Sequence, residues 1–492
     1  MRKSKGVLLP PVRRSRRLRR GDLYGALRNA LVEGVFASGD RLPSTRAAAA
    51  DYEVSRGLME EVFAQLTDEG FLDRRVGRGT FVSSRLAGLP STPTATAPIR
   101  HSSRGPSRRG LALAANAACR EPERPVPFNA GIADTSAFPW KIWCRLQARA
   151  TRELGAAGLS FADPRGLPDL RAAIAHHLAQ FRGIRCTPRQ VIIFNSAQQA
   201  LNAIAALLLN RGDEIWLEDP GYPGARAAFE LAGGRTISVP VDEDGLSVDA
   251  GVKRSPRARL AYVTPPHQYP TGVTLSLERR IQLLQWAMRN DSWIIEDDYD
   301  GDFRYSGQPL AALYSLDSAE RVLYLSTLNK SMFVYLRLAY MVVPEELVEP
   351  VANIRSQMDG FSPPLMQMTT SLFMEEGYFS SHLRRMRSVY GAKRKTLIAG
   401  LASATNLGWT WSNNPAGIHL LVRHKSGDQV RSVVQRSRLD LALLSRYRRA
   451  RAQEDGLFLR FGALDPSTLQ TGVQELVTVM KKIANPRSRS VT

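Results

Sequence analysis

Short runs of β-branched and aromatic residues alternate with amphipathic segments over residues 127–485, and this alternation constrains the fold more than any other feature. The runs expected to form strands are residues 191–194, 214–217, 260–263, 293–296, 322–325 and 338–342. Segments with helical spacing of apolar residues, such as 201–209 and 277–288, lie between them. Strands that alternate with helices pair in a mostly parallel sheet that the helices cover. The sequence therefore predicts an α/β fold for this part of the chain.

Residues able to hold a ligand follow four of these strands, at the positions where open parallel sheets bind their ligands. They are Asn195, Ser196, Ala197 and Gln198; Tyr222; Asp297, Asp298 and Tyr299; and Lys330, with Arg337 seven residues later. A helix that starts at residues 195–198 can bind an anion through its amides. The ring of Tyr222 can stack on a flat ligand.

Lys330 and Asp297 indicate the chemistry of this edge of the sheet. A lysine that loses its proton in an apolar pocket attacks an aldehyde and forms a Schiff base. Pyridoxal phosphate needs such a lysine, an aspartate that keeps its ring nitrogen protonated, and a phosphate pocket lined by cations or amides. Either residue alone has a common structural explanation, as a surface lysine or a capping aspartate. Their joint order and spacing predict a site for this cofactor.

A separate small domain is predicted for residues 22–84. Leu23, Leu27, Leu31 and Val35 recur every four residues, which indicates a first amphipathic helix. Ser44 and Ser55 are placed to cap two further helices, the second of which turns Leu58, Val62 and Leu66 inward. A glycine-containing turn at residues 76–79 then separates two short strands. Three helices followed by such a hairpin are typical of a winged helix-turn-helix, whose third helix enters the major groove of DNA.

Positive charge is concentrated near the amino terminus. The formal charge of the chain is +21, and residues 1–110 hold 21 Lys and Arg against 10 Asp and Glu. Such a segment attracts nucleic acid, because each phosphate that it neutralises releases condensed counterions. The arginine-rich arm within residues 1–21 is explained equally well as a solvated tail when it is taken alone. The domain that follows it favours double-stranded DNA as the partner.

The remaining segments contain few residues that could form another site. Residues 85–126 are rich in Pro, Ser, Thr, Ala and Arg without a helical or strand period, and we expect a flexible linker there. Cys119, Cys144 and Cys186 are scattered, which predicts free thiols and no metal site or disulfide framework. The chain has neither an apolar run long enough to span a membrane nor a secretory signal, so the cytoplasm is the expected location.

The segment GDRLPSTRAAAADYEVSRGLMEEVFAQLTDEGFLDRRVGRGTFVS resembles the GntR family of DNA-binding domains. By position, the resemblance implies that Arg46 and Arg56 contact phosphates and bases of the DNA, and that Arg41 contacts a further phosphate. It makes Ser44 and Ser55 helix caps that also reach the DNA backbone, and Arg78 and Gly79 the tip of the wing. The chain departs from the family in its third helix, which carries Gly57, Leu58, Glu60 and Glu61. Two carboxylates that face DNA would repel phosphate.

The larger part of the chain resembles the class I/II aminotransferases of fold type I, and with the small domain in front it resembles the MocR subfamily of GntR regulators. The resemblance rests on DPRGLPDLRAAIAHHL, EDPGYPGARAA, PHQYPTGVTLSLERR, IIEDDYDGDFRY and HLRRMRSVYGAKR. It implies that Lys330 forms the Schiff base, Asp297 pairs with the pyridinium and Tyr299 lies beside the phenolic oxygen. Arg337, Thr327 and residues Ser196, Ala197 and Gln198 would hold the phosphate, Tyr222 would stack on the ring, and His267 and Gln268 would lie nearby.

Departures from this second family cluster at the same site. Ser196 replaces a glycine and Ala197 a hydroxyl residue, Ser326, Asn329 and Ala339 replace small residues near the lysine, and Phe161 replaces a tyrosine. Lost hydroxyls should weaken phosphate binding, each by about 1.5–3 kcal/mol where the partner is charged. The arginine that holds the substrate carboxylate in catalytic relatives is replaced by Phe458, with Arg460 two residues later on the same strand face.

Three functions remain open at this point. The first is a regulator that binds DNA as a homodimer and senses pyridoxal phosphate, another form of vitamin B6 or a small amine through its body. The second is a working aminotransferase that carries a DNA-binding domain. The third is a regulator whose body no longer binds the cofactor. The intact Lys330, Asp297 and Tyr299 favour the first two over the third, and the altered carboxylate and phosphate positions favour the first over the second.

Overall fold

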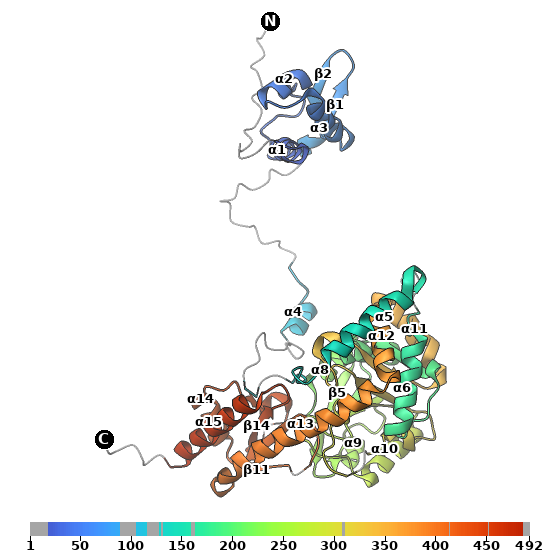
Figure 1. Cartoon of the computed structure of the whole chain (residues 1–492), viewed down its shortest axis with the longest axis vertical. Helices are drawn as coiled ribbons and strands as arrows, with labels where there is room; N and C mark the ends of the chain where they lie inside the picture. The colour runs from blue at the N-terminus through green and yellow to red at the C-terminus, as the bar shows by residue number, and fades with distance from the viewer. Residues whose placement is uncertain are drawn as a thin grey trace, which may run out of the picture. The chain divides into compact units, whose positions relative to one another are not determined.

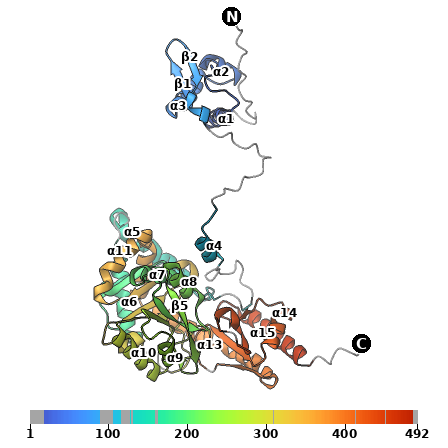
Figure 2. The ribbon, with the colours of Figure 1, turned by 180° about the vertical axis from the view of Figure 1, so that it is seen from behind.

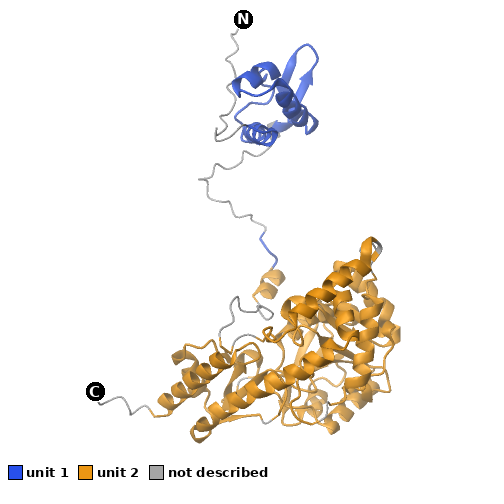
Figure 3. Cartoon of the chain, in the orientation of Figure 1, with its two compact units in different colours: residues 1–107 blue, residues 108–492 orange. Residues whose placement is uncertain are grey.

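The computed structural model describes residues 18–88, 105–115, 127–128, 131–158, 163–307, 310–412, 414–450 and 452–485. The chain divides into two compact units, residues 1–107 and 108–492 (Figure 3). The division falls inside the predicted linker, 85–126, but that interval is not without structure, because it contains the helix α4 (Arg108–Ala114). Most of the basic arm, Cys119 and Phe161 lie outside the described residues.

The first unit is the predicted winged helix-turn-helix. Its elements are α1 (Arg20–Val32), α2 (Thr45–Asp51), α3 (Arg56–Asp68), β1 (Leu72–Arg75) and β2 (Gly79–Val82). The two strands pair antiparallel, with Leu72 opposite Val82, and form the wing. The side chain of Ser44 accepts a hydrogen bond from Ala47 N, and that of Ser55 accepts one from Leu58 N, both at 3.2 Å. Both serines therefore cap helices as the sequence predicts.

Two apolar positions of this unit differ from the prediction. Val35 lies beyond the end of α1 and is 59% exposed, whereas Phe36 next to it is buried. The helix ends earlier because Gly34 adopts a φ of 72°, which is unfavourable for a continuing helix. On α3 the inward face is formed by Met59, Val62, Phe63 and Leu66, and Leu58 is only half-buried.

The second unit is built on an eight-stranded sheet. Its strand order is β3-β10-β9-β8-β7-β4-β5-β6, and the five strands β9, β8, β7, β4 and β5 run parallel to their neighbours in that group. The bounds are β3 (Val191–Phe194), β4 (Glu214–Asp219), β5 (Arg235–Asp242), β6 (Gly245–Leu246), β7 (Leu260–Val263), β8 (Trp293–Asp298), β9 (Val322–Thr327) and β10 (Ala339–Val342). The mostly parallel sheet is confirmed. The sequence did not predict β5, whose Pro240 argues against a strand within the sheet.

Helices cover both faces of this sheet (Figures 1 and 2). Residues of β8 show how the faces alternate: Ile295 packs in the cluster formed with α7, α8 and α11, and Ile294 packs in the cluster formed with α9 and α10. The helices are α5 (Trp140–Gly158), α6 (Pro168–Phe181), α7 (Ala197–Leu208), α8 (Pro223–Ala232), α9 (Val248–Arg254), α10 (Leu277–Asn290), α11 (Val348–Asp359) and α12 (Pro364–Glu375). The core between these layers fixes the strand ends that form the site.

A smaller antiparallel sheet follows the long helix α13 (Tyr378–Leu401) and forms, with its helices, the red lobe that carries the labels α14, α15 and β14 in Figure 1. Its strand order is β11-β12-β14-β13. The bounds are β11 (Trp409–Trp411), β12 (His419–His424), β14 (Asp455–Arg460) and β13 (Ala442–Leu443). The helices α14 (Gly427–Arg436) and α15 (Pro466–Ala484) pack on this sheet. The register places His419 directly opposite Arg460. The sequence did not predict this sheet as a separate element.

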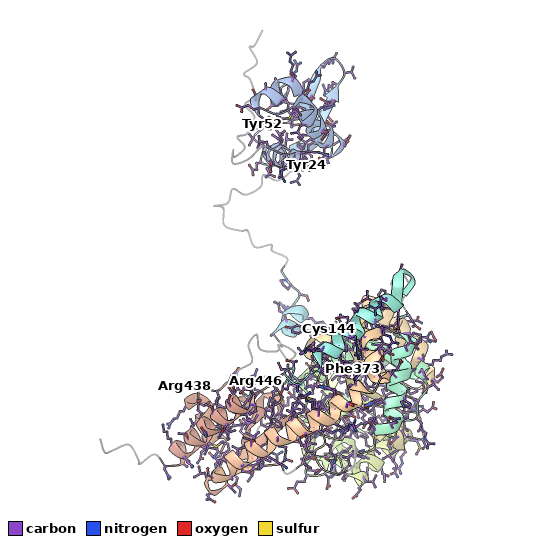
Figure 4. The ribbon with its side chains drawn as sticks, viewed as in Figure 1. Tyr24, Tyr52, Cys144, Phe373, Arg438 and Arg446 are labelled. Atoms are coloured by element: carbon purple, nitrogen blue, oxygen red, sulfur yellow. The ribbon has the colours of Figure 1, made fainter. Side chains whose placement is uncertain are left out.

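Both described cysteines are free thiols, as expected. Cys144 is exposed on α5 (Figure 4), and Cys186 is half-buried. Burial raises the pKa of the Cys186 thiol to about 11, so this cysteine is protonated at neutral pH. No helix in the described ranges combines the length and apolarity needed to cross a bilayer.

Candidate cofactor site and nucleic-acid interface

A cavity of about 190 Å³ lies at the carboxyl ends of the parallel strands of the large sheet. Six of the predicted residues line it, namely Ala197, Tyr222, Asp297, Tyr299, Thr327 and Lys330. Its other lining residues are Gly131, Tyr262, Tyr269, Ile418, His419, Phe458 and Arg460. Of the other predicted residues, Ser196, Gln198 and Arg337 are not part of the lining. The amine and the carboxylate that the sequence paired therefore lie in one cavity.

Asp297 is the buried acid of this cavity. Its Oδ2 accepts a hydrogen bond from Tyr262 Oη at 2.6 Å, and its Oδ1 is buried without a partner among the described residues. Burial raises the pKa of Asp297 to about 6, although the Tyr262 hydrogen bond and the charge of Lys330 act in the opposite direction. A protonated ring nitrogen would give Oδ1 the donor that it lacks, so the residue fits a pyridinium.

Lys330 lies in the loop between β9 and β10, with its Nζ 5.1 Å from the ring centroid of Tyr299. Two hydrogen bonds hold this loop: Thr327 Oγ1 accepts from Asn329 N at 3.2 Å, and Asn329 Oδ1 accepts from Leu338 N at 3.1 Å. Asn329, which departs from the family pattern, therefore links the two sides of the loop that presents the lysine.

The predicted phosphate turn is the amino terminus of α7. Ser196 caps this helix and accepts from Gln199 N at 3.1 Å, while Gln198 Nε2 donates to Gly224 O at 2.9 Å. The first amides of the helix have no intrahelical acceptor, and Ala197 lines the cavity. Arg337 is exposed, with a φ of 55°. The hydroxyl that Ser196 introduces is used for capping, and the turn offers backbone amides to an anion.

Aromatic rings form the wall of the cavity around Tyr269. Its ring is edge-on to those of Tyr222 at 5.5 Å, Tyr299 at 5.6 Å, Tyr447 at 5.5 Å and Phe458 at 5.3 Å between centroids. Such edge-to-face contacts stabilise a fixed arrangement of rings. The cavity therefore offers flat apolar surfaces beside the amine of Lys330.

A buried polar network supports this wall from behind. His267 Nδ1 lies 3.0 Å from Asp300 Oδ2 and 3.2 Å from Tyr299 Oη. Gln268 Nε2 donates to Glu218 Oε2 at 3.0 Å, and burial raises the pKa of Glu218 to about 7. His267 and Gln268, which the sequence placed near the pocket, position its lining residues. Ligand atoms of His267, Asp300 and His419 lie within 4.8 Å of one another, with His267 hydrogen-bonded to Asp300 and His419 Nδ1 3.9 Å from the same carboxylate.

Arg460 is the cation of the second sheet that reaches the cavity. Its Nη2 donates to Tyr447 Oη at 2.9 Å and to Tyr269 Oη at 3.2 Å. Phe458 is fully buried and contributes only its ring to the lining. Arg460 therefore brings a guanidinium to the lining of the cavity, and Phe458 does not bring a charge.

The sequence did not single out Tyr262, Tyr269 or His419. Tyr262 and His419 stand within apolar strands, where a tyrosine hydroxyl or an imidazole among aliphatic residues indicates a buried polar contact. Tyr269 is joined to Pro270 by a cis peptide bond. No local pattern in the sequence places these residues in the same cavity, because Tyr262 and His419 come from two different sheets and Tyr269 from a loop.

The predicted nucleic-acid contacts lie on the surface of the first unit. Arg41, Ser44, Arg46, Ser55, Arg56, Arg78 and Gly79 are all exposed. No described carboxylate lies within ion-pair distance of Arg46 or Arg56, so both guanidinium groups are available to phosphate. Arg41 packs over the wing, because a Cβ built on Gly79 would lie 3.0 Å from its Nε. Gly79 has a φ of 107°, a backbone conformation that favours glycine.

Glu60, one of the two carboxylates on α3, forms an ion pair across to the wing. Arg74 Nη1 lies 2.6 Å from Glu60 Oε1, and this contact lowers the pKa of Glu60. Its charge is therefore compensated within the domain, whereas Glu61 is exposed. The expected repulsion of phosphate is reduced to that of one carboxylate.

Both parts of the chain match families of known proteins. Residues 137–450 match the model of class I and II aminotransferases, and residues 19–82 match that of bacterial regulatory proteins of the gntR family. The probable rhizopine catabolism regulatory protein MocR of Rhizobium meliloti is 35% identical over 459 residues, which are 92% of each chain. The pyridoxine biosynthesis transcriptional regulator PdxR of Corynebacterium glutamicum is 30% identical over 454 residues, 92% of this chain and 93% of that protein.

A solved structure matches the second unit. LysN, an α-aminoadipate aminotransferase from Thermus thermophilus, was crystallised with N-(5'-phosphopyridoxyl)-L-leucine. It superposes with a TM-score of 0.68 at 26% identity and covers 76% of this chain and 97% of its own. The fold of a pyridoxal-phosphate-dependent family is thus present.

Proposed function

This chain belongs to the MocR subfamily of GntR regulators, and from that membership we propose that its body binds pyridoxal phosphate at Lys330 and reports the bound state to its DNA-binding head. The chain is a transcriptional regulator with an aminotransferase-like domain, and its GntR domain is a DNA-binding domain. The observation that carries the proposal is the buried Oδ1 of Asp297, which has no partner among the described residues and lies in the same cavity as the Lys330 amine.

The lining residues that the sequence predicted each have a defined task when the cofactor is bound. The cofactor supplies an aldehyde that reacts with an amine and a ring that withdraws electrons. Lys330 provides the amine, Asp297 Oδ1 accepts from the ring nitrogen, and Tyr222 covers the ring. Tyr299, which is hydrogen-bonded to His267, offers its hydroxyl to an oxygen on the ring. The amino terminus of α7 supports the phosphate through its backbone amides, with Thr327 nearby.

Arg337 would join the phosphate site in an assembled homodimer, which we propose as the functional form. The arginine is exposed in the single chain, and Tyr335 beside it is 87% exposed. Two bodies that pair would carry two heads, which suits DNA with two half-sites.

Regulation requires that the cofactor or an amine bound with it has different affinities for two arrangements of the heads. An effector amine with a carboxylate would be held by Arg460, whose guanidinium bridges Tyr447 and Tyr269. The position of Arg460 in the cavity lining also favours transamination as a second function of the body, since a carboxylate-bearing amine could be held beside Lys330. The experiment below separates the two.

The test uses the full chain supplied with pyridoxal phosphate. We expect a visible absorbance band, a borohydride-stable adduct that maps to Lys330, and a cofactor-dependent change in the gel shift of promoter DNA. Lys330→Ala should lose the adduct and the cofactor dependence, whereas Lys395→Ala, which alters an exposed lysine on α13, should keep both. Steady ketoacid formation from an amino donor would identify an enzyme. An unchanged gel shift with a bound adduct, or no adduct at all, would refute the sensor.

A further inference from the structure

His419 lies in the cavity wall with no assigned role. It begins β12 and is 5% exposed, and its register partner across the small sheet is Arg460. Directly opposed residues of an antiparallel pair point to the same face, with Cβ atoms about 4.5–5.5 Å apart. The imidazole of His419 and the guanidinium of Arg460 therefore lie side by side on the cavity-facing side of this sheet.

The neighbours of the imidazole define which nitrogen carries its proton. His419 Nδ1 lies 3.9 Å from Asp300 Oδ2, and the ring stacks near-parallel to Tyr299 at 16° and packs 4.6 Å from Phe458. Burial and the charges of His267, Lys330 and Arg460 lower the pKa of His419 well below its ordinary value, so the ring is neutral. The negative charge of Asp300 favours the imidazole proton on Nδ1, the nitrogen that faces the carboxylate, although their separation of 3.9 Å is longer than a hydrogen bond.

Nε2 is then a bare acceptor. This atom is buried and has no hydrogen-bond partner among the described residues. A buried acceptor without a donor is unfavourable, and binding a ligand that supplies the donor removes that cost. The nearby hydroxyls of Tyr269 and Tyr447 both pair with Arg460 instead.

We propose that His419 makes the cavity selective for amines that carry a hydrogen-bond donor, a hydroxyl or a second amino group, close to a carboxylate. The proposal rests on the proposed function, in which the effector is an amine held beside Lys330. The carboxylate lies on Arg460, and the donor reaches His419 Nε2. Because these side chains start about 5 Å apart on neighbouring strands, one short ligand can reach both, and a hydroxy-amino acid carries the carboxylate and the donor close together.

The test compares ligands that differ by one hydroxyl. The cofactor-loaded full chain is titrated with L-serine and L-alanine, with L-threonine and L-2-aminobutyrate, and with L-homoserine and L-2-aminobutyrate, while the visible band of the cofactor is followed. For at least one pair we expect the hydroxylated member to bind about tenfold more tightly, the effect of one hydrogen bond to a buried acceptor. His419→Phe should reduce that ratio to within about twofold. His419→Gln, whose amide oxygen can accept, should keep most of it.

A second measurement needs no variant. The O-methyl ether of the preferred hydroxy-amino acid keeps the oxygen but lacks the donor, and we expect the unaltered chain to lose its preference for it. Equal affinities within all three pairs, an undiminished ratio in His419→Phe, or undiminished binding of the ether would overturn the role of His419. If the unaltered chain shows no cofactor band, the proposed function fails as well. A visible cofactor band together with equal affinities for the paired amino acids would refute only the role of His419.

Discussion

Asp297 and Asp298 are consecutive residues of β8, and their carboxylates face opposite sides of the sheet. Asp297 points into the cavity with Tyr262, whereas Asp298 forms an ion pair with Arg182 and accepts from Tyr324 Oη at 2.6 Å. The alternation of side chains along a strand enforces this separation. Asp297 is thus available to a ligand in the cavity, whereas Asp298 is paired inside the protein.

Asparagine substitutions at these two positions should have different effects. Asp297→Asn removes the charge that a pyridinium requires, and we expect the cofactor to bind about 10- to 150-fold more weakly, the loss of one charge-assisted hydrogen bond. Asp298→Asn leaves Arg182 buried without its partner and should lower the free energy of unfolding by about 3–5 kcal/mol. Cofactor titration and urea unfolding of both variants check this. Equal cofactor affinities in the two variants would contradict it.

Glu218 should make the stability of the body depend on pH. Its pKa rises from 4.5 to about 7 in the folded state because it is buried, so between these values the folded chain binds a proton that the unfolded chain has released. The contribution of Glu218 to the free energy of unfolding is therefore present at low pH and is lost as the pH rises through about 7. We expect the free energy of unfolding of Glu218→Gln, relative to that of the unaltered chain, to increase by roughly 2–3 kcal/mol from pH 5 to pH 8. Urea unfolding at both values measures this, and a pH-independent difference would refute it.

The ion pair of Glu60 and Arg74 should matter more for DNA binding than for stability. The two side chains are 46% and 37% exposed, so their contact contributes at most about 1 kcal/mol to folding. Arg74→Ala would leave a second uncompensated carboxylate on α3, and we expect DNA affinity to fall about three- to tenfold at low salt. Arg74→Ala combined with Glu60→Gln should recover most of that loss. A double variant no better than Arg74→Ala would show that Arg74 itself contacts the phosphate.

Gly417 should tolerate no side chain. It has a φ of 76°, and a Cβ there would overlap His267 Cε1 and lie 2.8 Å from Asp300 Oδ2. Gly377 is a matched control, because its φ is 79° and no described atom lies within 4 Å of such a Cβ. We expect Gly417→Ala to lower the free energy of unfolding by roughly 1–3 kcal/mol more than Gly377→Ala does. Gly417→Ala should also weaken cofactor binding, because the new methyl group displaces His267 from Tyr299. Thermal unfolding and cofactor titration compare them, and equal losses would contradict the crowding argument.

Predictions from the sequence were most accurate where the relevant interactions are local. The strands at 191–194 and 260–263 have the predicted bounds, and Ser44 and Ser55 cap the helices that they precede. These features depend on hydrogen bonds and apolar periods within a few residues, which a sequence displays directly. The errors at Val35 and Leu58 arose at a helix end and on a helix face, where neighbouring elements decide which residue is buried.

The sequence by itself determined the order of the two domains, the α/β alternation of the body, and the lysine and aspartate that line its cavity. Only the tertiary structure decided that Arg460 and His419 lie opposite each other in that cavity, that Asp297 Oδ1 has no partner among the described residues, and that Arg74 compensates Glu60. The physical reason is that these contacts join elements far apart in the chain. Their geometry depends on strand register and on the packing of two sheets, which no local pattern of residues specifies.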